Sequence, residues 1–199
     1  MISADQVKQL RDKTGAGMME CKAALSEANG NIDEAITLLR KRGLAQAAKR
    51  AGRATAQGMI GSYIHMGGKI GVLVEVNCET DFVARTDDFQ NLVKEIGMHI
   101  AAADPKWVRR EDVPAEAIEK EKSIYRAQME NTGKPANVLD KIVEGKLGSF
   151  YSQFVLLDQP SVRDPNVSIA QLVAQASVKT GENITVGRFV RFRVGEAQD

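Results

Sequence analysis

The fold of this chain is decided by residues 59–77, which read MIGSYIHMGGKIGVLVEVN. Apolar residues alternate with small or polar ones before the pair Gly67-Gly68, and a glycine pair suits the positive φ angles of a tight hairpin turn. The residues after this pair are rich in branched apolar side chains, which favours a strand at the centre of a sheet. The stretch therefore predicts a hairpin of two antiparallel strands.

A third strand is predicted over residues 184–194. Its alternation predicts one covered face and one face carrying Arg191 and Arg193. The residues expected on the covered face are Ile184, Val186, Val190, Phe192 and Val194. No later strand pattern follows, so we expect this strand to join the hairpin in an antiparallel sheet of about three strands.

Helices are expected to cover one face of that sheet. A stripe at helical spacing is formed by Phe89, Leu92, Val93, Ile96 and Ile100, and a second helix is expected over residues 168–180. A charged helix from about residue 114, the turn Asn131–Pro135 and a further apolar helix predict a helical hairpin over about 114–148. The predicted fold class is α+β.

Three short helices are predicted before the sheet. Ser3 and Gln6 form a capping box that opens the first, and Gly15 is suited to close it. The second is expected to bury Met18, Cys21, Leu25 and Ala28 on one stripe. Asn31 opens the third helix, which is expected to end at Gly43 before a small, basic and partly helical linker over residues 44–57. So small a bundle is marginally stable by itself, which indicates a docking module attached to a larger domain.

The composition argues against several classes of protein. The 27 basic and 26 acidic residues leave a net charge of +1, so no cationic field favours direct binding of nucleic acid or of a membrane. No apolar run approaches the roughly 20 residues of a membrane span. The cysteines Cys21 and Cys78 form no CxxC motif, which favours small buried thiols in the cytoplasm. No motif for a cofactor or a metal is present.

Two alternative sites have simpler explanations. Cys78 with Asp81, and His65 or His99 brought near by folding, would be a thiol nucleophile with a base, but a buried cysteine and ordinary histidines explain the same residues. Arg188, Arg191 and Arg193 could face RNA, but no aromatic residues of the stacking kind accompany them. A solvated strand face accounts for the arginines better.

Residues 80–85, TDFVAR, lie where the central strand ends and a helix begins. Asp81 can cap the following turn there. Phe82 is either a core residue or a protruding anchor of the kind that dominates binding energy at protein interfaces. Sequence patterns alone leave both interpretations open.

Residues 10–25, LRDKTGAGMMECKAAL, resemble the N-terminal signature of the bacterial elongation factor Ts family. Residues 76–84, VNCETDFVA, resemble the second signature of that family, and residues 187–196, GRFVRFRVGE, are also similar to it. The matches occur in the family's order and separation, and they span nearly the whole chain.

The resemblance implies a three-helix domain of ubiquitin-associated type at 1–53 and an α+β core at 54–199. It implies that the partner is elongation factor Tu and that the chain is an exchange factor with no bond-making chemistry. The exchange wedge would comprise Thr80, Asp81, Phe82 and Val83. The docking residues would be Arg11, Met18, Met19 and His65.

The sequence departs from the long members of this family in two respects. It shows one core subdomain where they have two, and it shows no additional C-terminal helix. Both departures resemble the short members, which assemble as homodimers so that a second copy supplies the missing subdomain. The resemblance therefore implies a homodimer.

Overall fold

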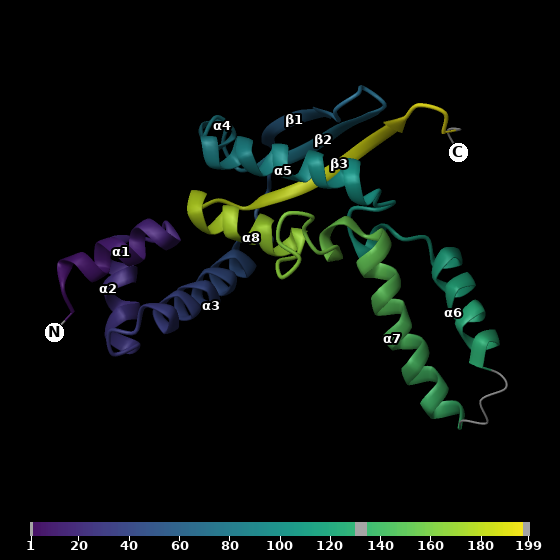
Figure 1. Ribbon diagram of the computed structural model, residues 1–199, viewed down its shortest axis with the longest axis horizontal. Coiled ribbons are helices and arrows are strands. Elements are labelled where there is room, and N and C mark those ends of the chain that lie inside the picture. Colours follow the sequence, from purple (N-terminus) through teal and green to yellow (C-terminus); the bar gives the residue numbers. More distant parts are fainter. Residues whose placement is uncertain (1, 130–134, 197–199) are drawn as a thin grey trace. The chain divides into compact units, whose positions relative to one another are not determined.

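The computed structural model describes residues 2–129 and 135–196. Within these residues the chain forms eight α-helices and a three-stranded sheet (Figure 1). The chain packs as two compact units. The first comprises Met1–Met59, Asn77–Leu92 and Gln171–Thr185, and the second comprises Ile60–Val76, Val93–Ala170 and Val186–Asp199. The predicted α+β class is confirmed.

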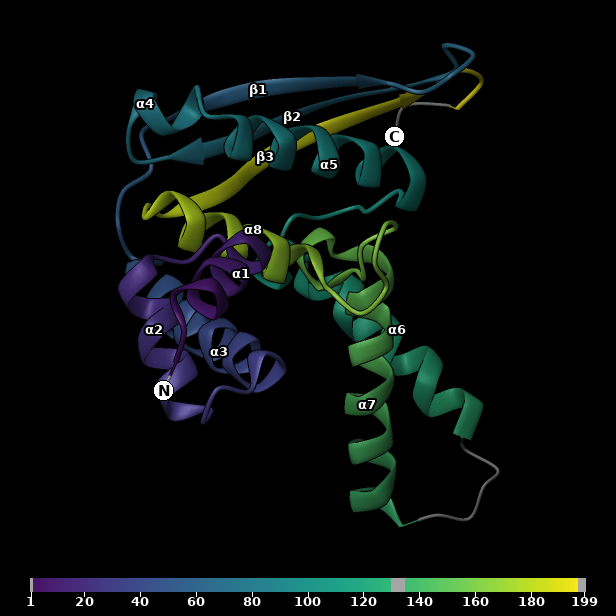
Figure 2. The same cartoon turned by 60° about the vertical axis from the view of Figure 1, so that its left-hand side comes forward.

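The first unit begins with three helices that pack together (Figure 2). They are α1 (Ala4–Thr14), α2 (Met18–Glu27) and α3 (Ile32–Arg50). The Ser3 hydroxyl accepts a hydrogen bond from the Gln6 N–H, and the Gln6 side chain accepts one from the Ser3 N–H, so the predicted capping box is confirmed. Gly15 ends α1 with a φ of 68°, in the left-handed region that glycine adopts at low cost.

The core of this bundle consists of small and branched apolar side chains. Its buried members are Val7, Leu10, Cys21, Ala24, Leu25, Ala28 and Ala35. Met18 was expected among them, but 46% of its surface is exposed. It is the first residue of α2, where the preceding turn places it at the rim of the bundle. The expectation that Met18 belongs to the buried stripe is therefore wrong.

The prediction that α3 ends at Gly43 is also wrong, because the helix continues to Arg50. Gly43 is buried against α8 (Ile169–Thr180), and a Cβ atom built on it would lie 3.0 Å from Cγ2 of Val178. The glycine therefore permits close approach of two helices. A helix-interior glycine costs only about 1 kcal/mol relative to alanine, and such contacts offset that cost.

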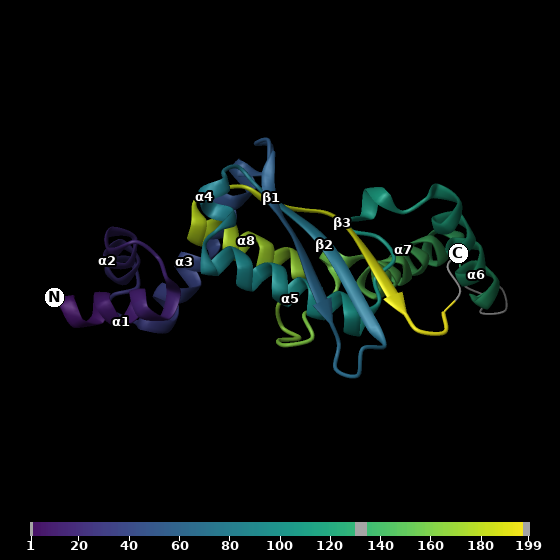
Figure 3. The ribbon, with the colours of Figure 1, turned by 90° about the horizontal axis from the view of Figure 1, so that it is seen from above.

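The sheet contains β1 (Gln57–Ile64), β2 (Ile70–Cys78) and β3 (Ile184–Arg193), in the order β1-β2-β3 (Figure 3). The predicted hairpin is confirmed: Gly67 and Gly68 have φ angles of 88° and 68°, and the His65 N–H donates to the Ile70 carbonyl at 2.9 Å. The third strand joins the hairpin beside the central strand β2, as predicted.

Helix α5 (Asp87–Ala103) buries the predicted stripe of Phe89, Leu92, Val93, Ile96 and Ile100. Two glycines let this helix approach the sheet. A Cβ atom on Gly61 would lie 2.2 Å from Cγ1 of Val93, and one on Gly97 would lie 3.2 Å from Cβ of Tyr63. Neither position has room for an additional methyl group without movement of the neighbouring side chain or backbone.

The predicted faces of β3 are only half correct. Ile184 and Val186 are buried, but Val190, Phe192 and Val194 are exposed. Arg191 is the covered residue: its guanidinium donates to the Ala101 carbonyl, and 9% of its side chain is exposed.

Val186 and Arg191 are therefore both covered although they are an odd number of residues apart. The burial of β3 therefore does not alternate regularly along the strand.

The remaining elements are two helices of the second unit and three short segments. Helices α6 (Ala115–Met129) and α7 (Ala136–Phe154) lie side by side, which confirms the two helices of the predicted hairpin (Figures 1 and 2). Residues 131–134 of the predicted turn lie outside the described residues. The short segments are α4 (Asp81–Ala84), η1 (Arg110–Asp112) and η3 (Leu156–Asp158).

Candidate functional site

The candidate site is the turn that follows the central strand. Strand β2 ends at Cys78, and Thr80 is the N-cap of the four-residue helix α4, because its hydroxyl accepts a hydrogen bond from the Val83 N–H at 3.4 Å. Asp81 was expected to cap this turn, but it is the first helical residue. It pairs with Arg85 one turn later, in an exposed ion pair that contributes little to stability.

Phe82 protrudes from this turn. Its neighbour Val83 is buried, whereas 76% of the surface of Phe82 is exposed. Successive residues of a helix point about 100° apart, so the side that anchors Val83 in the core directs Phe82 away from it. The interpretation of Phe82 as a core residue is therefore excluded, and a large apolar ring lies free on the surface.

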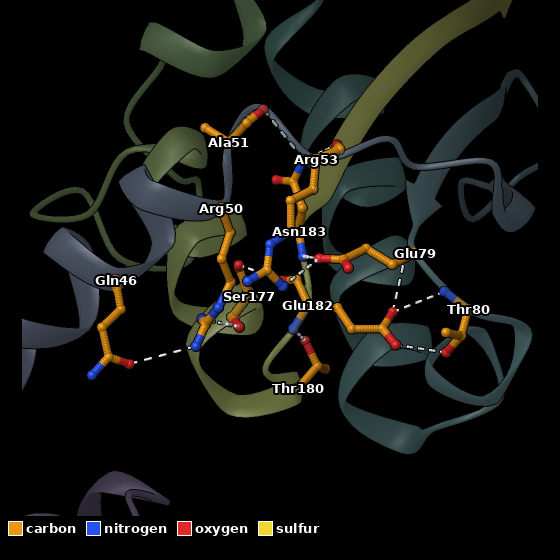
Figure 4. A network of polar contacts seen from close by, with 10 residues as sticks. All are labelled: Gln46, Arg50, Ala51, Arg53, Glu79, Thr80, Ser177, Thr180, Glu182 and Asn183. Carbon is orange, nitrogen blue, oxygen red and sulfur yellow. Dashed lines mark hydrogen bonds and ion pairs between the residues drawn. The ribbon is translucent and has the colours of Figure 1, made fainter.

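Behind the turn lies a network of hydrogen bonds that sequence reasoning missed (Figure 4). The Glu182 carboxylate accepts from the backbone N–H groups of Glu79 and Thr80, at 3.1 and 3.0 Å, and from the Thr80 hydroxyl at 2.6 Å. The Glu79 carboxylate accepts in turn from the Asn183 N–H at 2.6 Å. The Glu182 carboxylate, from the segment before β3, thus bonds to the residues after β2. The Glu79 carboxylate, which follows the end of β2, bonds in turn to the residue before β3.

Asn183 extends the network to the segment that follows α3. Its side-chain amide donates to the carbonyls of Ala51, at 3.3 Å, and Arg53, at 2.8 Å. Close by, Arg50 donates to the Ser177 carbonyl at 3.2 Å. The only signal in the sequence was the position of Gly181-Glu182-Asn183 directly before a strand expected beside the hairpin.

The thiol of Cys78 is held in the same region and is unsuited to nucleophilic chemistry. It is buried and donates to the Thr80 carbonyl at 3.1 Å. Burial raises the pKa of the Cys78 thiol, and the Glu182 carboxylate raises it further. The reactive thiolate is therefore disfavoured near neutral pH.

The two histidines that were considered as its base are occupied elsewhere. His99 is buried in the second unit, where one ring nitrogen bonds to the Gln159 side chain at 2.8 Å and the other accepts from the Val162 N–H. Burial lowers the pKa of His99. His65 is exposed in the β1–β2 turn and bonds to the Tyr63 hydroxyl.

Three other residues singled out in the sequence lie on the N-terminal bundle. Arg11 is exposed on the last turn of α1, and Met18 and Met19 are exposed at the start of α2. Met19 has 76% of its surface exposed. The bundle thus presents a cation and two flexible thioether side chains next to the Gly15 turn, a composition suited to a protein-binding surface.

The arginines considered for RNA binding are engaged in ion pairs. Arg188 pairs with Glu75 at 2.9 Å, Arg191 with Asp104 and Glu196, and Arg193 with Glu196. Paired guanidinium groups have reduced attraction for phosphate, so these side chains do not form a free basic strip.

Over residues 2–129 and 135–196, no cluster of three or more His, Cys, Asp or Glu side chains is arranged to hold a metal ion. Nor does any helix in those ranges have the length and apolar character needed to cross a membrane.

Comparison with known proteins places these features in a family. The family model described as Elongation factor TS matches residues 2–196. Elongation factor Ts of Fervidobacterium nodosum is 62% identical over 195 residues, which cover 98% of this chain and 99% of that protein. The Solibacter usitatus protein of the same name is 60% identical, over 99% of this chain and 93% of its own length.

Elongation factor Ts of Thermosipho melanesiensis is 59% identical over 98% of this chain and 100% of its own length. The predicted three-helix start, the three-stranded sheet and the protruding TDFV turn thus occur in a sequence that matches these proteins nearly end to end. The chain belongs to the elongation factor Ts family of translation elongation factors.

Proposed function

We propose that this protein is a guanine-nucleotide exchange factor that binds elongation factor Tu in its GDP form and promotes release of the nucleotide. Membership of the family makes this GTPase the expected partner. The observation that carries the proposal is the exposed ring of Phe82 on a capped turn. A large apolar side chain held out from a folded surface has the character of an interface anchor.

The energetic task is to weaken a tight nucleotide site. A GTPase that binds GDP at nanomolar strength has about 12 kcal/mol of binding free energy to overcome. In a ternary complex, the factor and the nucleotide each lower the other's affinity by the same ratio. Disturbance of Mg²⁺ and of the donors around the phosphates is the effective route, because these groups hold the nucleotide most strongly.

Each residue of the turn has a separate part in this mechanism. Phe82 is the wedge that enters the GTPase beside its magnesium and phosphate site. Thr80 caps the turn and Val83 anchors it in the core, while Asp81 positions the wedge. No covalent bond forms or breaks in these steps, so the protein acts by binding and not as an enzyme.

Arg11, Met18 and Met19 on the N-terminal bundle are assigned to docking on the GTPase domain of the partner. His65, in the β1–β2 turn of this chain, is assigned to contact with a second domain of the partner. The exposure of all four side chains supports this assignment. We accordingly propose residues 1–53 as a docking domain of ubiquitin-associated type and residues 54–199 as the core domain.

We also propose that the protein is a homodimer. The face of the sheet opposite α5 carries exposed apolar side chains, among them Ile60, Leu73 and Val190, which line a shallow hollow. Such a face favours burial against a second sheet. The proposed setting is the cytoplasm, where the two buried free thiols are compatible with reducing conditions.

The wedge is tested by stopped-flow release of a fluorescent GDP analogue from elongation factor Tu. Phe82→Ala should slow release at saturating factor by about 100-fold, a loss of about 2.7 kcal/mol that is typical of a strong interface anchor. Val138→Ala, which truncates another exposed apolar side chain on α7, is the matched control and should leave release unchanged. Release at the normal rate with Phe82→Ala would rule out the wedge.

The homodimer is tested by sedimentation equilibrium at micromolar concentrations. The wild-type protein should have twice the mass of the 21.7 kDa chain. Leu73→Glu should halve that mass, because a buried unpaired carboxylate is costly in an interface. A wild-type protein that sediments as a monomer would contradict the proposal.

A further inference from the structure

The helix that carries Phe82 is too short to hold itself in place. Helix α4 has four residues, Asp81–Ala84, and nucleation makes an isolated helical turn unfavourable in water. Its orientation must therefore be set by contacts outside the turn. Val83 anchors the turn through its buried side chain, and Thr86 bonds to the Val83 carbonyl at the far end, so the start of the turn is left to other contacts.

Thr80 starts the turn, and its N–H, hydroxyl and carbonyl groups all form hydrogen bonds. Its N–H and its hydroxyl both donate to the Glu182 carboxylate, and its carbonyl accepts from the thiol of Cys78. Glu182 is half-buried and lies 102 residues further along the chain. Glu182 is thus the main distant group that fixes the backbone at the start of the turn.

The direction of the Thr80 hydroxyl proton also depends on Glu182. A hydroxyl has one proton to donate, and here it is directed to a carboxylate oxygen at 2.6 Å. The oxygen's lone pairs are then available to accept from the Val83 N–H, which is the bond that caps α4. A charged acceptor makes this arrangement stronger than a neutral one would.

The position of Glu182 is itself secured. Gly181, on one side of Glu182, has a φ of 77°, which turns the chain sharply after α8. Asn183, on the other side, is buried and bonded through its backbone N–H to Glu79 and through its side chain to two carbonyls. The carboxylate therefore projects from a braced segment toward the Thr80 cap (Figure 4).

From these contacts we propose that Glu182 is a positioning residue for nucleotide exchange, which presents Phe82 to the GTPase by holding the Thr80 cap. The proposal rests on the proposed function of Phe82 as the wedge. A ring that is already held in its bound orientation loses less conformational entropy on binding, which lowers the free-energy cost of entering the partner's site. Glu182 does not itself touch the partner in this mechanism.

The test substitutes Glu182→Gln, which keeps the size of the side chain but replaces one of the two oxygens that accept the three donors of Glu79 and Thr80 with an amide NH2 group. GDP release at saturating factor should slow about tenfold, which is the scale of a lost helix cap. The factor concentration at half-maximal release should change much less. Glu144→Gln, an exposed carboxylate on α7, is the matched control and should leave both quantities unchanged.

Two further variants separate positioning from general destabilisation. In a Phe82→Ala background, Glu182→Gln should cause no additional loss, because there is no wedge left to position. Thr80→Val, which removes the hydroxyl, should reproduce the slow release, and its effect should not add to that of Glu182→Gln. Circular dichroism melting identifies the temperature range in which all variants are folded.

The outcomes distinguish this proposal from the function on which it rests. Normal release with Glu182→Gln, or an equal loss with and without Phe82, would overturn the role of Glu182 and leave the wedge intact. If the wild-type protein did not accelerate GDP release, the proposed function would fail instead. Amide hydrogen exchange at Val83 tests the cap independently of GDP release. Faster exchange in Glu182→Gln supports the step in which Glu182 holds the Thr80 cap, and unchanged exchange overturns it.

Discussion

The packing beneath the sheet in the second unit and the exposed residues of the first unit illustrate opposite uses of apolar side chains. Under β1, the contact of Gly61 with Val93 leaves no room for a methyl group. In the first unit, the ring of Phe82 has three quarters of its surface free. The first arrangement contributes to the free energy of unfolding, whereas the second contributes nothing to it until a partner covers the ring. Stability and nucleotide exchange should therefore respond to different substitutions.

The largest effect on stability is expected from Gly61→Ala. The added methyl would lie 2.2 Å from Cγ1 of Val93, which forces the helix or the strand to move. The free energy of unfolding should fall by about 3 kcal/mol, at the upper end of overpacking effects. Urea denaturation measures the change.

Val93→Ala offers a control for this clash. The double variant should lose less stability than the sum of the two single variants, because alanine removes the methyl groups that collide with the new side chain. Strict additivity would show that the two residues are not in the contact described.

A smaller effect on stability is expected from acid, through His99. Burial lowers the pKa of His99 in the folded protein. The hydrogen bond to Gln159 and the charge of Glu95, which pairs with Arg163, oppose that shift only in part. The unfolded chain thus binds the proton more readily. The contribution of the neutral ring to stability is complete above the unfolded pKa of about 6.5 and declines as pH falls below it.

Urea denaturation between pH 7.5 and pH 5 measures this decline. His99→Asn removes the titrating group and should flatten the slope over that range, even though the variant is less stable at every pH. A slope that persists in the variant would assign the acid sensitivity to other groups.

Among the exposed residues, Met19→Ala should weaken docking to the partner without changing the exchange step. Truncation of a peripheral apolar contact typically costs about 1 kcal/mol of binding free energy. The concentration of factor that gives half-maximal GDP release should rise about fivefold, and the rate at saturation should stay the same. An equal fall in the saturated rate would place Met19 in the exchange step.

The smallest effect on stability is expected from Phe82→Ala, the variant with the largest expected effect on exchange. Since the ring contributes little buried surface, the free energy of unfolding should change by no more than about 0.5 kcal/mol. A larger loss, measured in urea, would mean that the ring packs within its own molecule and would erase the contrast between the two regions.

Local patterns were sufficient to predict most of the architecture. The Ser3 and Gln6 capping box, the Gly67-Gly68 turn and the stripe from Phe89 to Ile100 were all read correctly, because each depends on residues a few positions apart. The signature around residues 76–84 indicated the family. The same resemblance implied that Phe82 is an exchange wedge, whereas residue patterns alone left its burial open.

What the sequence could not determine depends on residues that are distant in the chain. Gly43 was predicted to end α3 but packs against Val178 in the interior of that helix. In β3, Arg191 is covered although Val190 was predicted to be. The bonds from Glu79 and Thr80 to Glu182 span more than 100 residues. Periodicity reports which side chains share a face of one element, but only tertiary packing decides what that face meets. The Glu182 carboxylate behind the Phe82 turn was therefore visible in the folded chain alone.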